Sequence, residues 1–161
     1  MFLYVAGRGE LFGYHAVLAE EDYPDSASTL ERSVISYIPN EDFLNLIFRS
    51  PEFNRGFFKV LSHEFTVLSN YQLLIAQGTA TQCLATALIV FREKSKDAGV
   101  VGEQVCINIT RADLAHLAAI SIDTVIRLLK DWKKSGIIRS AGRKIWVKDL
   151  KRLIDLTAWV D

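Results

Sequence analysis

The stretch from residue 109 to residue 147 limits what this chain can fold into more than any other. It holds two short segments of helical apolar spacing, separated by a polar break. Thr110 and Ser121 stand directly before these segments, where a hydroxyl group can cap a helix, and Asp113 completes a capping-box pattern with Thr110. The pattern predicts two consecutive helices joined by a tight turn.

The second of these helices is expected to have one buried and one exposed face. The residues expected to face inward recur at helical spacing: Val125, Leu128, Leu129 and Trp132. The opposite face then carries Ile122, Asp123, Ile126, Arg127 and Lys130. Gly136 is expected to end the helix, since glycine commonly follows the last helical residue.

Two β-rich runs follow, at residues 137–139 and 144–147, with a turn predicted at Ala141 and Gly142. Two helices, a short turn and a hairpin form a winged helix-turn-helix pattern, which places its second helix in the major groove of DNA. A small helical bundle with a basic surface is the alternative interpretation.

The distribution of charge favours the DNA-binding interpretation. The chain has a formal net charge of zero, with 19 basic and 19 acidic residues. From residue 109 onward there are 11 Lys and Arg against 6 Asp and Glu, a charge of +5, so residues 1–108 carry −5. A basic C-terminal part can bind phosphate, whereas the acidic remainder repels it.

Composition excludes several other classes of protein. No apolar run approaches the roughly 20 residues that a membrane span needs, and the first residues do not form a signal peptide, so we expect a soluble, cytoplasmic protein. Cys83 and Cys106 lie far apart without a CxxC pair, so neither a disulfide framework nor a metal or iron–sulfur site is indicated. No cofactor is predicted. The chain lacks the GxSxG, HExxH and Walker motifs, so we predict that it is not an enzyme.

The first 38 residues alternate between β-like runs, at 2–5 and 33–38, and stretches rich in turn-forming residues. This alternation predicts a few antiparallel strands. So few strands leave open sheet edges, so that either a helix covers them or the chain begins within a domain.

A long helix is predicted from Ser50 and Pro51, a capping residue followed by proline at the first helical position, to about Gln77. One stripe of this helix has heptad spacing and predicts a homodimer seam: Phe58, Leu61, Phe65, Leu68, Gln72 and Ile75. Burial within one subunit is the alternative. A second stripe suits contact with the N-terminal part: Phe57, Val60, Val67 and Leu74.

Gly78 and Thr79 are expected to end the long helix. A further helix is predicted at 81–94, followed by a polar linker at 94–102, a short strand at 104–109 and a last helix in the tail from 147 to 161. The tail helix is expected to pack on the winged domain or on a partner subunit.

In this order, the elements resemble the bacterial Crp/Fnr-type transcription regulators. The resemblance rests chiefly on residues 109–111 (ITR) and 121–130 (SIDTVIRLLK), and also on 9–13 (GELFG) and 26–27 (SA). It implies an α+β chain: a partial β-roll of the cyclic-nucleotide-binding, double-stranded β-helix type, a long dimerisation helix and a C-terminal winged helix-turn-helix. The expected domains are 1–77, a partial sensor with the dimerisation helix, and 78–161, the DNA-binding domain. The resemblance also implies that this chain lacks the first part of the family's sensor β-roll.

The chain departs from the family at the positions that would bind a cyclic nucleotide. Asp25 and Ser26 stand where an Arg-Ser pair would meet the phosphate, and Tyr14 stands in place of a glutamate that would meet the ribose. A carboxylate repels a phosphate diester, so no response to cyclic AMP is predicted. The cysteine cluster of the iron–sulfur branch is absent, and His15 and His63 do not make a haem site.

The resemblance also implies roles for residues of the second helix. Arg127 matches a guanine-reading arginine, with a phosphate contact as the alternative; Asp123 is placed to accept from a cytosine amine or to cap the helix; and Ile122 can touch a thymine methyl group. Phosphate contacts are expected from Thr110, Arg111, Ser121, Lys130, Lys133, Arg143 and Lys144. Lys133 can instead be a solvated helix end, as can Lys134 beside it.

The expected function is therefore sequence-specific transcription regulation by a homodimer on a palindromic DNA site. Double-stranded DNA and a second copy of the chain are the implied partners, with RNA polymerase and an unidentified small-molecule effector as further candidates and no membrane. The alternative is an effector-sensing or protein-interaction module whose winged helix does not read DNA specifically.

Overall fold

The computed structural model describes residues 5–96 and 105–157. Within these residues the chain divides into two compact units. One unit comprises residues 10–72, and the other comprises residues 5–9 together with the described residues from 73 to 157. The two units are described separately below.

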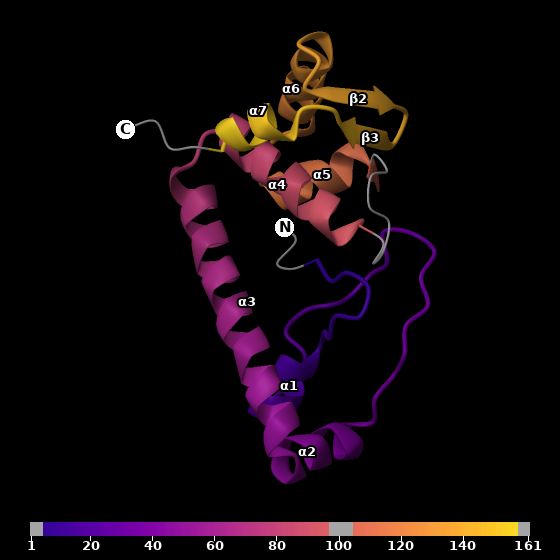
Figure 1. Ribbon diagram of the computed structural model, residues 1–161, viewed down its shortest axis with the longest axis vertical. Helices are drawn as coiled ribbons and strands as arrows, with labels where there is room; N and C mark the ends of the chain where they lie inside the picture. Colours follow the sequence, from indigo (N-terminus) through magenta and orange to yellow (C-terminus); the bar gives the residue numbers. More distant parts are fainter. Residues whose placement is uncertain (1–4, 97–104, 158–161) are drawn as a thin grey trace. The chain divides into compact units, whose positions relative to one another are not determined.

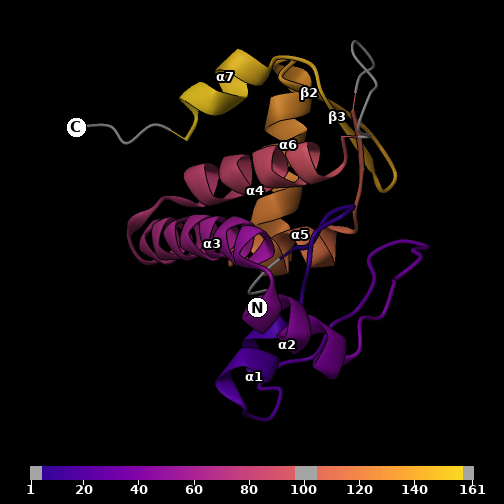
Figure 2. The same cartoon turned by 60° about the horizontal axis from the view of Figure 1, so that its bottom comes forward.

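The centre of the C-terminal unit is helix α4, Ala80–Lys94 (Figure 1). Thr79 caps it: the Thr79 side chain accepts from the Gln82 amide, and the Gln82 side chain accepts in return from the Thr79 amide. The helix starts one residue before the predicted position. Leu84 and Leu88 are fully buried, because α4 contacts α5, α6, α7 and strand β1 (Figure 2).

The helix-turn-helix consists of α5, Arg111–Ala118, and α6, Ile122–Lys134. Both predicted capping residues are confirmed, since the Thr110 hydroxyl accepts from the Asp113 amide and the Ser121 hydroxyl accepts from the Thr124 amide. Ala119, with a φ of 52°, makes the turn between the helices. All four residues expected to face inward from α6 are buried: Val125, Leu128, Leu129 and Trp132.

A three-stranded antiparallel sheet completes this unit. Its strands are β1, Cys106–Asn108, β2, Ile138–Ala141, and β3, Lys144–Val147, in the order β1-β3-β2. Strands β2 and β3 form the predicted wing. Ala141 pairs with Lys144, so the turn is made by residues 142 and 143 and not, as predicted, by Ala141 and Gly142. Strand β1 pairs Ile107 with Ile145, and both of these side chains are fully buried.

The last described helix is α7, Leu150–Asp155, which packs against α4 of the same chain. Asp149 caps it by accepting from the Arg152 amide, and the Arg152 guanidinium donates to the Ser135 carbonyl at the end of α6. The tail helix is thus part of the C-terminal unit. This agrees with the first of the two predicted arrangements, in which the tail packs on the winged domain. Trp159, also expected on this helix, lies outside the described residues.

The N-terminal unit is helical. It contains α1, Tyr14–Ala19, α2, Asn40–Arg49, and most of α3, Pro51–Gln77, which has the bounds expected from the sequence. The Ser50 hydroxyl accepts from the Phe53 amide at the start of α3. Aromatic rings contributed by all three helices pack against one another: Tyr14, Phe43, Phe53 and Phe57.

The expected antiparallel strands are not found in residues 5–38, so this prediction is wrong for that part of the chain; residues 2–4 of the first run lie outside the described residues. Val34 is 99% exposed and Tyr37 is 81% exposed, so the run at 33–38 has no sheet to cover one of its faces. Alternating apolar residues form a strand only where a neighbouring strand supplies hydrogen bonds and burial. The α+β class is nevertheless confirmed, with its strands gathered in the C-terminal unit.

Two more predicted segments fall partly outside the described residues. These are the linker at 94–102, of which 97–102 are not described, and the strand at 104–109, of which 104 is not described. Of the described residues 105–109, Cys106–Asn108 form β1.

The packing of α7 leads to a stability prediction. We expect Leu153→Ala, at a fully buried position, to lower the free energy of unfolding by about 2–5 kcal/mol, because it removes apolar contacts and leaves a cavity. Ile154→Ala, at the neighbouring and 48% exposed position, is the matched control and should change stability by about 0.5 kcal/mol or less. Urea unfolding of both variants measures the difference, and equal losses would contradict the packing described here.

Candidate nucleic-acid interface

The exposed face of α6 carries the residues predicted to read bases. Asp123 and Arg127 are exposed, one helical turn apart, and neither side chain has a hydrogen bond or an ion pair within the described part of the chain. Ile122 and Ile126 lie beside them and are 45% and 50% exposed. Because the apolar face of α6 is buried and its polar face is exposed, the polar face can enter a DNA groove without disturbing the core of the domain.

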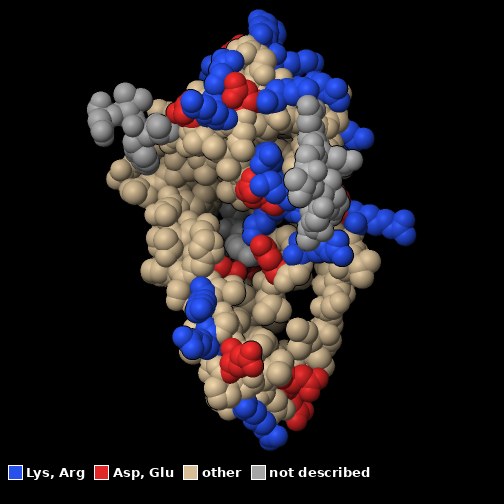
Figure 3. All heavy atoms as spheres, viewed as in Figure 1, with Lys and Arg blue, Asp and Glu red and all other residues tan. Residues whose placement is uncertain are grey.

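Basic side chains surround this helix. In Figure 3 the Lys and Arg atoms gather at the top of the view, over the part of the chain that Figure 1 labels α6, β2 and β3. The exposed cations contributed by these elements and their turn are Arg127, Lys130, Lys133, Lys134, Arg139, Arg143 and Lys144. This arrangement creates a positive potential on the side of the domain that presents α6.

The wing is tied to the helix-turn-helix by contacts that sequence reasoning missed. The Arg111 guanidinium donates to the Gly142 carbonyl, at 3.0 Å from Nη2, and Lys133 Nζ donates to the Ser140 carbonyl at 3.1 Å. The Ile109 amide donates to the Arg143 carbonyl at 3.1 Å, at the end of the β1–β3 pairing. Long separations in the chain, 31 residues for Arg111 and Gly142, left no local pattern to reveal these contacts.

The seven residues predicted to contact phosphate therefore differ in whether their side chains already have partners within the protein. The side chains of Lys130, Arg143 and Lys144 are exposed and have no partner among the described residues. The hydroxyl groups of Thr110 and Ser121 cap their helices, and the Thr110 hydroxyl also donates to the Asp113 carboxylate at 2.5 Å. Arg111 and Lys133 both donate to carbonyl groups of the wing.

An aromatic contact stabilises the solvent side of the wing. The Arg139 guanidinium lies over the Trp146 ring, 4.2 Å from its centroid, on the neighbouring strand. A cation–π contact of this kind is worth about 0.5–1 kcal/mol at an exposed site. The Arg139 side chain therefore already makes a contact within the wing.

In the N-terminal unit, the positions compared with a cyclic-nucleotide site do not carry groups that suit a phosphate. The Asp25 carboxylate lies 3.7 Å from Nε2 of His15, and the Tyr14 hydroxyl donates to the Glu64 carboxylate. Groups of three or more His, Cys, Asp or Glu side chains that suit a metal ion are absent from the described residues.

The predicted dimer seam lies along α3. Phe58, Phe65 and Leu68 are 60%, 72% and 40% exposed, Gln72 is exposed, and Leu61 and Ile75 are half-buried. On the second stripe, Phe57 and Leu74 are buried, whereas Val60 and Val67 are each 46% exposed. The first stripe thus presents large apolar side chains to solvent over several turns of the helix.

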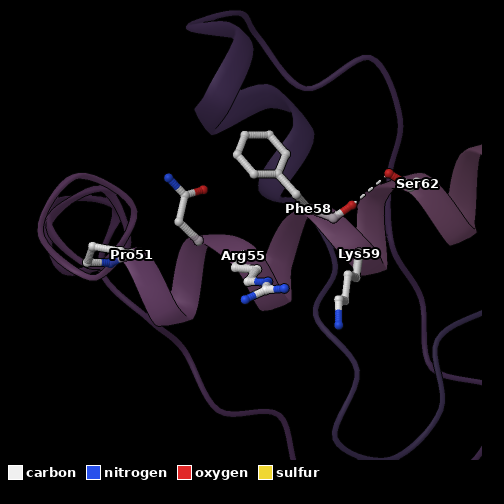
Figure 4. A pocket seen from close by; sticks show the side chains of 6 residues that line it. Pro51, Arg55, Phe58, Lys59 and Ser62 are labelled. Carbon is white, nitrogen blue, oxygen red and sulfur yellow. Dashed lines mark hydrogen bonds between the residues drawn. The ribbon is translucent and has the colours of Figure 1, made fainter.

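A shallow hollow lies beside the start of this seam, on the first turns of α3 (Figure 4). The Ser62 hydroxyl there donates to the Phe58 carbonyl at 2.8 Å, and the side-chain oxygen of Asn54 is buried without a partner among the described residues. All of the residues that line the hollow belong to α3: Pro51, Asn54, Arg55, Phe58, Lys59 and Ser62. The hollow is thus an open surface feature of one helix.

In the part of the chain that the structure describes, helices long and apolar enough to span a membrane are absent.

The C-terminal unit is a winged helix-turn-helix domain by its fold: two capped helices, a short turn and a hairpin tied to them. Residues 82–156 match the family model described as the Crp-like helix-turn-helix domain. Together with the sequence relatives below, this match shows that the chain is similar to regulators of the Crp/Fnr family.

Two relatives illustrate the relationship. The anaerobic regulatory protein of Haemophilus influenzae is 26% identical over 149 residues, which cover 92% of this chain and 58% of the relative. The fumarate and nitrate reduction regulatory protein of Escherichia coli is 24% identical and is covered over 59% of its length. This chain thus spans about three fifths of the length of the curated relatives it matches. Both relatives are regulatory proteins by name.

Solved structures support the fold. FixK2 from Bradyrhizobium japonicum superimposes with a TM-score of 0.65 at 20% identity, covering 77% of this chain and 61% of that one. A Crp/Fnr-family transcriptional regulator of Thermus thermophilus superimposes with a TM-score of 0.58 at 25% identity, covering 67% and 55%.

The capping role of Ser121 can be separated from any contact it makes with a ligand. We expect Ser121→Ala to lower the free energy of unfolding by about 1 kcal/mol, because the Thr124 amide loses its acceptor. Ser121→Asp keeps an acceptor at the N-terminus of α6 and should retain stability close to that of the wild type. Thermal unfolding of both variants tests this, and an aspartate variant as unstable as the alanine variant would argue against the cap.

Proposed function

We propose that this protein is a transcription regulator that binds double-stranded DNA through α6 and the wing. The observation that carries the proposal is the exposed face of α6, where Asp123 and Arg127 have no partners among the described residues and exposed cations surround them. A Crp-like helix-turn-helix domain at residues 82–156 and regulators among the relatives support it. In this scheme residues 78–161 bind DNA, and residues 1–77 hold the sensing and dimerising parts.

Base reading is assigned to three residues of α6. Arg127 donates to O6 and N7 of a guanine, which suits the fork of its guanidinium, and Asp123 accepts from the N4 amine of a cytosine. Ile122 contacts a thymine methyl group, which its 45% exposure at the first turn of the helix allows. The preferred half-site therefore contains a G·C pair and a thymine.

Phosphate binding is assigned to the exposed cations Lys130, Arg143 and Lys144, whose side chains have no intramolecular partners among the described residues. Each cation that neutralises a phosphate releases counterions, so affinity should fall steeply as salt rises. The capping residues Thr110 and Ser121 stand at helix N-termini, where backbone amides and the helix dipole also favour a phosphate.

The proposed active form is a homodimer that joins along the exposed stripe of α3. Large apolar side chains such as Phe58 and Phe65 are costly to leave in water, and heptad spacing suits a two-stranded contact. A two-fold axis would present two copies of α6 to a palindromic site with half-sites about one DNA turn apart.

Cyclic AMP is not the proposed effector. Asp25 brings a carboxylate to the position of the arginine that would meet a cyclic phosphate, and Tyr14 stands in place of the glutamate that would meet the ribose. The second candidate function is a protein-interaction module, favoured by the exposure of Ile122 and Ile126 on α6. It predicts a dimer without salt-dependent affinity for DNA.

Selection of bound sites from random duplex DNA tests the proposed function. The full chain should enrich a two-fold symmetric site containing a guanine in each half. The Arg127→Ala variant should lose about 1–3 kcal/mol of discrimination at that guanine, because its bidentate hydrogen bonds are removed. Enrichment of no sequence by the wild-type chain would rule out specific reading, whereas a uniform loss at all positions would make Arg127 a phosphate contact.

The dimer seam is tested by a charge placed within it. Phe65→Asp should convert the dimer into a monomer at micromolar concentration, because it buries an unpaired carboxylate in an apolar contact. Val67→Asp changes another exposed apolar residue of α3 outside the seam and is the matched control, which should remain dimeric. Sedimentation velocity distinguishes the two, and an unchanged mass for Phe65→Asp would count against the seam.

A further inference from the structure

The wing is attached to the helix-turn-helix and to the residue before it through three carbonyl groups in and beside its turn. The Ser140, Gly142 and Arg143 carbonyls accept from Lys133, Arg111 and the Ile109 amide, respectively. Two of these donors are side-chain cations that the sequence analysis assigned to DNA phosphates. Their contacts with the wing suggest a different use of their charge.

The position of the Arg111 guanidinium separates it from the other cations of the interface. Nη2 donates to the Gly142 carbonyl, and Nη1 is shielded from solvent without a hydrogen-bond partner among the described residues. Burial lowers the pKa of Arg111 from its usual value, because desolvation disfavours the charged form. Lys130, Arg143 and Lys144, by contrast, are exposed.

The Gly142 carbonyl lies at the point of the wing where its conformation is least constrained by strand pairing. Residues 142 and 143 form the turn between β2 and β3, and Gly142 has a φ of +55°. Arg143 and Lys144 are in and directly after this turn, so the bond from Arg111 restrains the backbone that carries both cations. Restraining a loop in its bound conformation strengthens binding because less entropy is lost when the complex forms.

We propose that Arg111 is a positioning residue: it holds the wing turn through the Gly142 carbonyl, so that Arg143 and Lys144 are placed for phosphate contact, and it does not itself bind phosphate. This role rests on the proposed function, since it assumes that the wing meets DNA. Lys133 acts in the same way from α6, through the Ser140 carbonyl, and so links the wing directly to the base-reading helix.

The first arm of the test uses the protein without DNA. Amide hydrogen exchange across residues 138–147 is compared among the full-length wild type, Arg111→Met and Lys130→Met. The Arg111 variant should exchange faster at the wing, because its turn has lost a donor. The Lys130 variant removes an exposed cation without a partner among the described residues, and should exchange at the wild-type rate.

The second arm measures affinity for a selected duplex over a range of salt concentrations. Loss of a phosphate contact lowers the slope of log affinity against log salt by about 0.9, which is the result expected for Lys130→Met. Arg111→Met should weaken binding by about tenfold, the loss expected for one hydrogen bond, with the slope unchanged. In a chain that already carries Arg143→Ala and Lys144→Ala, the same change should have little effect, because Arg111 acts through those residues.

Arg111→Lys serves as a second variant if the methionine variant does not fold. It keeps the positive charge but not the reach of the guanidinium, so the wing should again exchange faster and affinity should fall. Near-wild-type affinity and exchange in Arg111→Lys would overturn the proposal, as would an Arg111→Met variant with a lowered salt slope, additive losses and unchanged wing exchange.

Failure of the proposed function gives a separate result. A wild-type chain without salt-dependent DNA affinity would overturn that function and the role of Arg111 in DNA binding. Faster wing exchange in Arg111→Met would still establish its contact with the wing in the free protein.

Discussion

The C-terminal unit depends on the buried face of α4. Leu84 and Leu88 have no exposed surface, and α5, α6, α7 and β1 all contact this helix. Burying a leucine side chain contributes about 1.5–3 kcal/mol relative to leaving it in water. The helix-turn-helix is too small to bury its own apolar face, so a helix outside the motif supplies the surface on which α5 and α6 are held.

Three of the cations in the domain make contacts within the protein and are not simply available to DNA. Composition alone makes each Lys and Arg of residues 109–147 a potential phosphate contact. In the folded domain, Arg111 and Lys133 bond to wing carbonyls and Arg139 lies over Trp146, so their donors or faces are already used. Charge in such a domain thus serves two purposes: it stabilises the scaffold, and it attracts a polyanion.

Helix capping and periodicity allowed much of the C-terminal unit to be predicted from the sequence. Thr110 and Ser121 cap the helices as expected, and the inward face of α6 was predicted residue by residue. These features depend on neighbours within four residues, for which the chemistry of the side chain is decisive. Thr79 follows the same rule, although the capping box it forms with Gln82 was missed because Gly78 and Thr79 were interpreted only as a break.

The sequence by itself determined the bounds of α3, the caps of α5 and α6, the buried face of α6 and the presence of the hairpin, because each of these is governed by local geometry. Only the tertiary structure decided that residues 33–38 form no strand, that α7 packs on α4, and that Arg111 reaches the Gly142 carbonyl. Each of these depends on a partner far away in the chain. A strand without a neighbour loses its hydrogen bonds, and a cation is directed to protein or to solvent only by the groups that the fold brings beside it.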